Sequence, residues 1–196
     1  NTNKGVEALI PDYQFFDAGA FVFTQKTFNK NLTLAGGLRF DNRNVDAKEM
    51  LEDTDVKFAK FNKNYSGISG SLGLSYQLDK HSTIKLNLSR GFRAPNIAEL
   101  SSNGIHEGTF RYEIGDINLK SEISHQIDAA YFLNSDHISF EFTPFVNFIS
   151  NYIYTEKMQD ANGNDVIIDP SDPVPAFRFT QGNAQLFGGE IFLDFH

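Results

Sequence analysis

The sequence predicts an all-β chain that forms an antiparallel, up-and-down segment of a transmembrane β-barrel. Apolar and polar residues alternate with a period of two over most of its length, as in strands that have one apolar and one polar face. Most of the alternating segments are about 10 to 15 residues long, whereas typical strands of soluble proteins have about five or six. Short and long connections also alternate along the chain, as they do in outer-membrane barrels.

The composition excludes several other classes of protein. The 196 residues include no cysteine, which excludes a disulfide framework and a thiolate metal site. A formal net charge of -8 argues against a nucleic-acid partner, because phosphate neutralisation needs clustered Lys and Arg. The mean hydropathy is -0.34, and no apolar run approaches the roughly 20 residues of a spanning helix. A barrel is compatible with these values, because its apolar residues are interleaved with polar ones.

Seven strands are expected. The clearest covers residues 65–78, in which Ile68, Leu72 and Leu74 occupy one face and mainly serine and glycine the other. The alternation recurs, less regularly near the two ends of the chain, in residues 13–26, 31–45, 82–92, 122–133, 137–149 and 177–195. Bacterial single-chain barrels have an even number of strands, so an odd number predicts a part of a larger barrel.

The connections between these strands differ in length. Short turns are expected at residues 28–30, 79–81 and 134–136, and long connections at residues 44–64, 93–121 and 155–176. In an outer-membrane barrel the tight turns face the periplasm and the long loops face outside the cell. Within the last long connection, Asn162–Gly163 is a pair that favours a type I′ turn, and its acidic neighbours lack the spacing of an EF-hand calcium loop.

The polar faces favour a barrel over a soluble sandwich. They carry mostly Ser, Thr, Gly, Asn, Gln and Ala, whereas the outer face of a sandwich meets bulk water and tends to carry many Lys and Glu. Small neutral side chains suit a lumen that holds water or a plug. A soluble antiparallel β-module that binds a ligand or partner remains the alternative. Pro144 is expected to interrupt its ladder unless it lies at a bulge or a sheet edge.

One stretch carries a family resemblance. Residues 89–95 read Ser-Arg-Gly-Phe-Arg-Ala-Pro, and residues 111–122 read Arg-Tyr-Glu-Ile-Gly-Asp-Ile-Asn-Leu-Lys-Ser-Glu. The combination resembles the TonB-dependent outer-membrane receptors, in which a strand ends in Gly-Phe-Arg-Ala-Pro and the external loop returns through Tyr-Glu-x-Gly-Asn-Pro-x-Leu-Lys-Pro-Glu. The sequence departs from that pattern at Asp116-Ile117 and at Ser121, where the family has Asn-Pro and Pro.

The resemblance implies a protein larger than these 196 residues. Such receptors have a barrel of about 22 strands, an N-terminal plug and a segment that engages TonB. Residues 1–196 are therefore expected to be part of the barrel domain, with the plug and the remaining strands outside them. The resemblance further implies an outer-membrane location, contact with outer-membrane lipid and energy from the TonB complex through the N-terminal part.

The expected activity of the whole protein is uptake of a metal ion, of a metal complex such as a siderophore or haem, or of a similar nutrient. A passive porin-like outer-membrane channel is the alternative. No cofactor is expected. No enzymatic activity is expected either, because no nucleophile motif or paired catalytic group accompanies the histidines.

The candidate ligand-binding residues lie on the connection over residues 93–121. They are Arg93, Glu99, His106, Glu107, Glu113 and Asp116. His106 and Glu113 are the candidate metal ligands, because imidazole and carboxylate groups bind divalent ions such as zinc. His106 with the downstream Tyr112 and Glu113 also resembles the loop of the zinc-uptake branch of the family. The alternatives are a solvated acidic loop and, for Arg93, a structural task in which its donors bind carboxylates or carbonyls.

Three charged residues on the polar faces are expected to point into the lumen or towards a plug. They are Arg39, Asp41 and Glu190. Glu190 could pair with an arginine of the plug, and the alternative is a hydrated carboxylate on the barrel wall.

Overall fold

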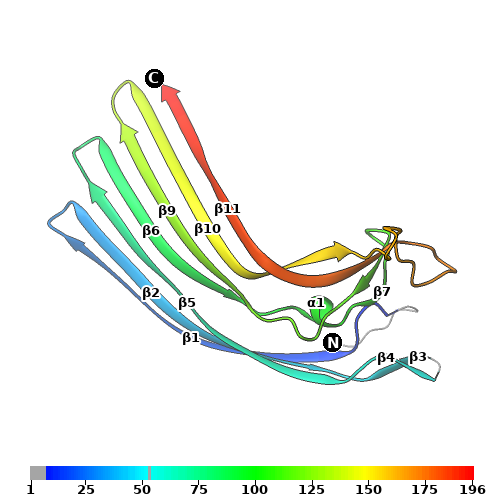
Figure 1. The fold of residues 1–196 in the computed structure, drawn as a ribbon. Helices are drawn as coiled ribbons and strands as arrows, with labels where there is room; N and C mark the ends of the chain where they lie inside the picture. The colour runs from blue at the N-terminus through cyan, green and yellow to red at the C-terminus, as the bar shows by residue number, and fades with distance from the viewer. Residues whose placement is uncertain (1–7, 53) are drawn as a thin grey trace.

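The computed structural model describes residues 8–52 and 54–196 and shows one curved, mainly antiparallel sheet (Figure 1). The seven long strands follow one another in sequence order, each hydrogen-bonded to the next, which confirms the predicted up-and-down arrangement. They contain between 12 and 20 residues. Their bounds are β1 (Tyr13–Phe28), β2 (Leu32–Ala47), β5 (Phe61–Gln77), β6 (Ser82–Arg93), β9 (Glu122–Asn134), β10 (Ile138–Lys157) and β11 (Ala176–Phe195).

Short elements occupy two of the long connections. β3 (Met50–Glu52) and β4 (Asp55–Phe58) form a hairpin between β2 and β5. Between β6 and β9 lie α1 (Ile97–Ser101), β7 (Asn103–His106) and β8 (Arg111–Ile114). β8 runs parallel to the start of β11, so β8 and β7 extend the sheet beyond β11. No helix of the described residues is long and apolar enough to cross a membrane.

The register assigns each side chain to a face of the sheet. Leu88 of β6 lies directly opposite Leu72 of β5 and Ile127 of β9. Its neighbour Ser89 lies opposite Ser71. Directly opposite side chains share a face, so one face is apolar and the other polar, as the period of two predicted.

The two faces differ in what covers them. The apolar face is bare, and its Phe187 is 79% exposed. On the polar face, a buried cluster that includes Leu100 of the β6–β9 loop packs against Phe61 and Tyr65, which share the polar side of β5 with Ser71. Figure 1 shows this loop inside the curve of the sheet. The polar face is therefore the concave side, and the apolar face is the convex side.

All three predicted short turns are present, at one end of the sheet. In the β1–β2 turn, Asn29 and Lys30 have positive φ of 46° and 60°. In the β5–β6 turn, the Asp79 carboxylate accepts hydrogen bonds from the backbone N–H groups of His81 at 2.7 Å and Ser82 at 2.9 Å. The bond from His81 is the main reason that the pKa of Asp79 lies below its ordinary value.

Pro144 lies in a central strand, between β9 and β11. The pairing of β10 with β9 stops at Phe142 and resumes at Phe145 in unchanged register. The ladder is thus interrupted where proline offers no N–H donor. The β-bulge of this strand lies further on, between Ile149 and Tyr152.

The type I′ turn predicted at Asn162–Gly163 is wrong. A type I′ turn needs positive φ at both central residues, whereas here Gly163 (φ 84°) has one and Asn162 does not. The turn is closed by the Gly163 N–H, which donates to the Asp160 carbonyl oxygen at 3.0 Å. The Asp160 carboxylate also accepts from the Asn162 N–H at 2.8 Å, so an aspartate at the first position directs the turn.

Candidate functional site

A small apolar core holds the β6–β9 loop on the concave side. Leu100 is fully buried and Leu119 is 4% exposed. Both belong to a cluster that contacts Tyr65 of β5 and Phe179 of β11. The Tyr65 hydroxyl also donates a hydrogen bond to the Leu119 carbonyl oxygen at 3.2 Å. The loop is thus packed against the barrel wall along its middle.

Arg93, the last residue of β6, connects four elements. Its guanidinium donates to both carboxylate oxygens of Glu122, the first residue of β9, at 2.6 and 2.7 Å. It also donates to Glu99 of α1 at 2.9 and 3.0 Å. Glu122 in turn accepts from the Ile153 N–H of β10 at 2.7 Å. This geometry is that of the structural alternative for Arg93, because the fork of donors is occupied by carboxylates.

Glu99 caps the short helix that follows. Its carboxylate accepts from the Asn96 N–H at 2.8 Å, while the Asn96 side chain accepts from the Glu99 N–H at 2.9 Å. This reciprocal pair is a capping box. Asp116 closes the other side of the loop, where its N–H donates to the Glu99 carbonyl oxygen at 2.9 Å. Glu99 and Asp116 therefore shape the loop from within.

The β7–β8 hairpin presents an imidazole and an aromatic ring at its tip. The tip comprises residues 106–110. His106 Nδ1 lies 2.8 Å from the Thr109 hydroxyl, and its side chain is 45% exposed. Phe110 has a positive φ of 49° and is 76% exposed. Glu107 is exposed in the same turn. The hydrogen bond at Nδ1 orients the ring and leaves Nε2 as the nitrogen available for a ligand.

Glu113 lies beneath this tip and is 5% exposed. Its carboxylate accepts from Arg111 Nε at 2.7 Å and lies 3.7 Å from His106 Nδ1. Among residues 8–52 and 54–196, no group of three or more His, Cys, Asp or Glu is placed to hold a metal ion. The zinc site at His106 and Glu113 stays a prediction. The closeness of the two side chains supports it, whereas the salt bridge from Arg111 to the Glu113 carboxylate opposes it.

The hairpin joins the two sides of the curved sheet (Figure 1). On one side, the Tyr112 N–H donates to the Pro175 carbonyl oxygen at 3.1 Å, just before β11. On the other, the Asn103 N–H donates to the Leu9 carbonyl oxygen at 3.0 Å, just before β1. The Tyr112 hydroxyl donates to Asn103 Oδ1 at 2.8 Å, and burial raises the pKa of Tyr112. The loop therefore crosses the concave side at the end opposite the short turns.

The charged residues expected in the lumen lie on the polar, concave face. Arg39 Nε donates to both carboxylate oxygens of Asp41 at 2.8 Å. Nearby, Arg43 forms a second ion pair with Asp17 at 2.7 Å, and the two pairs line a cavity of about 280 Å³. Glu190 lies nearer the short turns, beside a separate cavity of about 250 Å³. The structure therefore places Glu190 apart from Arg39 and Asp41 on this face.

Several residues of the site escaped the sequence reasoning. Glu122 and Arg111 hold the two predicted residues Arg93 and Glu113, and Phe110 is the exposed ring at the tip. The pairing of Arg93 with Glu122 joins residues 29 positions apart, which no local pattern reveals. The helix had a readable signal, because Asn at position 96 with Glu three residues later is a capping pattern.

Gly115 gives a direct test of the loop packing. A Cβ at this position would lie 2.6 Å from the Leu100 carbonyl carbon and 2.7 Å from Ser101 Cα, which are backbone atoms that cannot rotate away. We expect G115A to displace the return segment, at a cost of about 1–3 kcal/mol for overpacking. In the full-length receptor, limited proteolysis should cut the loop faster. G108A is the matched control, because its Cβ would meet only His106 Cε1 at 3.8 Å. Equal cleavage of both variants would contradict the packing.

A bare apolar convex face, a polar concave face, short turns at one end and long loops at the other define a segment of an outer-membrane β-barrel. Over residues 1–195 the chain matches the family described as TonB dependent receptor-like, beta-barrel. The chain belongs to this family, which is one of receptors and transporters of the outer membrane, and the predicted resemblance and location are confirmed.

Individual relatives agree with this assignment. The chain is 27% identical over 146 residues to a TonB-dependent heme receptor A of Haemophilus influenzae (strain 86-028NP), covering 69% of this chain and 20% of that protein. Its fold is similar to the hemophore receptor HasR of Serratia marcescens, with a TM-score of 0.76, 15% identity, and coverage of 100% of this chain and 34% of that one. The copper transporter OprC gives a TM-score of 0.75 at 19% identity, with coverage of 94% and 28%. The chain thus spans about a fifth of the curated relative.

Proposed function

We propose that the receptor containing this chain imports haem, and that the tip of the β7–β8 hairpin binds the haem iron through His106. The single observation that carries the proposal is the His106 ring, exposed at the tip of an external loop and oriented through Nδ1 by Thr109. Histidine is a common protein ligand of haem iron. The curated relative named a heme receptor supports the same cargo.

The surroundings of His106 suit a flat apolar ligand. Phe110 exposes its ring in the same turn, where it can contact a porphyrin face. Arg111, one residue further on, pairs with Glu113 and has its guanidinium over the Phe177 ring, 5.1 Å from the centroid. The hairpin is anchored on both sides, so the tip is held in place before the ligand arrives.

A divalent metal ion such as zinc is the second candidate cargo. The distance of 3.7 Å between His106 Nδ1 and the Glu113 carboxylate favours it. The salt bridge from Arg111 opposes it, because that guanidinium would have to leave before Glu113 could bind a cation. The haem proposal needs no such rearrangement, since it uses Nε2 of His106.

Growth tests of the full-length receptor distinguish these functions. In a bacterial host that cannot make haem, we expect the receptor to support growth on haemin, and to lose this support when TonB is removed. Growth that persists without TonB would indicate a passive channel instead. Failure on haemin, together with receptor-dependent uptake of zinc or of a ferric siderophore, would replace haem with that cargo. The amount of folded receptor in the outer membrane is the control in every arm.

A further inference from the structure

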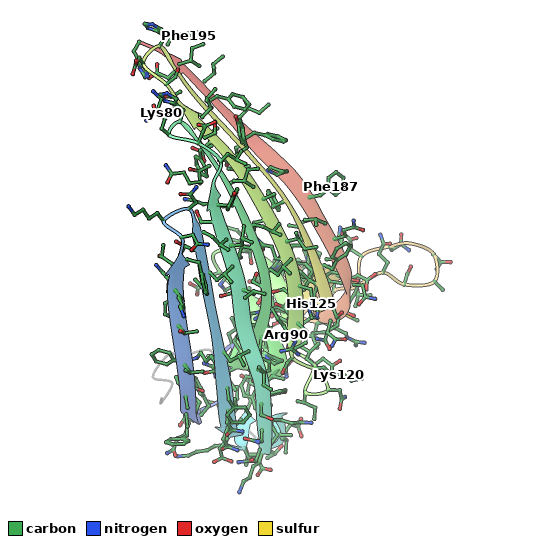
Figure 2. The ribbon with its side chains drawn as sticks, turned by 90° about the vertical axis from the view of Figure 1, so that its left-hand side faces the viewer. Lys80, Arg90, Lys120, His125, Phe187 and Phe195 are labelled. Atoms are coloured by element: carbon green, nitrogen blue, oxygen red, sulfur yellow. The ribbon has the colours of Figure 1, made fainter. Side chains whose placement is uncertain are left out.

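Two basic residues interrupt the apolar, convex face. Arg90 of β6 and His125 of β9 are directly opposite each other in the register. They follow the apolar pair Leu88 and Ile127 on the same face, two residues further from the short turns. Figure 2 labels Arg90 and His125 on adjoining strands of this face. A cation at a lipid-facing position is costly, so a pair of basic side chains there needs a physical reason.

Their depth in the membrane follows from the strand geometry. Arg90 is eight residues from Ser82 at the start of β6, which corresponds to about 26 Å along the strand and about 20 Å along the barrel axis. The apolar band of an outer-membrane barrel is about 25 Å tall, and the short turns face the periplasm. Arg90 and His125 therefore lie in the outer half of the band, close to the outer interface.

An apolar hollow adjoins the two side chains. Gly70 lies opposite Arg90, and the Leu38 side chain leans over it, since a Cβ at Gly70 would lie 2.7 Å from Leu38 Cδ2. The hollow beside Gly70 has a volume of about 430 Å³ and is lined by Arg90 and His125 together with apolar residues such as Leu72 and Phe148. A narrow aliphatic chain fits such a hollow, and a polar headgroup would then meet the basic pair.

The basic pair has unused capacity for an anion. Arg90 donates through Nη1 to the Ile68 carbonyl oxygen, which uses one of its five N–H donors and fixes the guanidinium beside the hollow. Within the described residues, no hydrogen bond or ion pair engages the His125 ring. Asp128 and Glu122, each three residues from His125 along β9, belong to the opposite face, since they pair with Asn87 and Arg93 and not with the row of Leu88. The convex site is thus positive at its polar end and apolar below.

We propose that this site, formed by Arg90, His125 and the Gly70 hollow, binds a phosphate-bearing lipid of the outer leaflet. The phosphate meets the Arg90 guanidinium, whose planar fork suits phosphate oxygens, and the His125 imidazole. One acyl chain lies in the hollow beside Leu72. The bound anion offsets the cost of the two basic groups at the lipid boundary. This inference is independent of the cargo that the receptor transports.

Lipid binding to the full-length receptor tests the proposal. The probes are bisphosphorylated lipid A, the same lipid with both phosphates removed, and phosphatidylglycerol, each added to detergent-solubilised receptor and detected by native mass spectrometry. We expect bisphosphorylated lipid A to bind, and the double variant Arg90→Gln/His125→Gln to bind it about tenfold more weakly, the size expected when a charged group loses its hydrogen bonds. Phosphatidylglycerol binding as tight as that of lipid A would assign the site to any phosphate lipid of the membrane.

Lys26→Gln is the matched control. Lys26 lies on the same face, opposite Leu34, but at the end near the short turns, with its ammonium 5.0 Å from the Phe28 ring centroid. We expect this variant to bind lipid A as the unaltered receptor does. Equal binding of lipid A by the double variant, or equal binding of the dephosphorylated lipid, would overturn the proposal. A receptor dimer that the double variant abolishes would reassign the face to a second copy of the chain. Heat-modifiable migration on gels verifies that each variant is folded.

Discussion

Replacing His106 by alanine is expected to lower the haem affinity of the full-length receptor by at least about 100-fold. Loss of a residue that only orients a metal ligand costs about 10- to 100-fold, and loss of the ligand itself is expected to cost no less. The reason is that His106 Nε2 is the iron ligand in the proposed complex, and its ring is already oriented by Thr109. Titration of the receptor with haemin checks the affinity, and the Soret band of the bound haem reports whether an imidazole ligates the iron.

Controls separate the ligand from the loop. His137→Ala removes a histidine next to the β9–β10 turn, at the far end of the sheet, and should leave the haem affinity unchanged. Thr109→Val removes the hydroxyl that orients the imidazole and should weaken binding less than H106A does. An H106A receptor with unchanged affinity and an unchanged Soret band would exclude His106 as the ligand. Growth on haemin that persists in the same variant would leave haem as the cargo and move its ligand elsewhere.

Replacing Arg93 by alanine is expected to loosen the β6–β9 loop and lower uptake. The change leaves Glu99 and Glu122 without their partner, and their side chains are only 11% and 12% exposed. Breaking a buried ion pair costs about 3–5 kcal/mol, and the 43% exposure of the Arg93 side chain reduces the expected loss to about 2–3 kcal/mol. Limited proteolysis of the full-length receptor should cut the loop faster, and uptake should fall.

Arg93→Lys gives the sharper comparison. Lysine keeps the positive charge but is a point donor, so it cannot bind both carboxylates with the planar fork of arginine. We expect an intermediate rate of loop cleavage. Arg178→Ala, which changes an arginine of β11 outside this network, serves as the control. If the loop of R93A resists protease as well as that of the unaltered receptor, the network does not hold the loop.

The long strands could be predicted because a period of two is a local property. Each segment shows its two faces without knowledge of its neighbours, and the register then places Leu88 and Ser89 on the faces that the alternation indicated. The strands extend further than the pattern did, since β10 continues past the bulge at Ile149 to Lys157. Beyond the bulge, this external end of β10 no longer shows the regular alternation of apolar and polar residues from which the strand was predicted.

The position of the β6–β9 loop could be predicted from the sequence, but its internal structure could not. α1, β7 and β8 have four or five residues each, too few for periodicity to reveal. Tertiary contacts stabilise them, such as the bond from Asn103 to Leu9 and the pairing of β8 with β11. The structure also assigns some candidate residues a different role, because it shows their hydrogen-bond partners. Glu99 was a possible ligand by type, and in the structure it caps a helix and pairs with Arg93.

The β7–β8 hairpin is hydrogen-bonded to the segment before β1 and to the segment before β11, so it bridges the two sides of the curved sheet across its concave side. Its two attachments, at Leu9 and at Pro175, lie on opposite sides of the curve. A ligand that pulls on the tip therefore loads both flanks of the barrel wall at once. The conformational entropy of ordering this segment is lost when the barrel folds, so in the proposed complex the tip is ordered before the cargo arrives and more of the contact energy contributes to affinity.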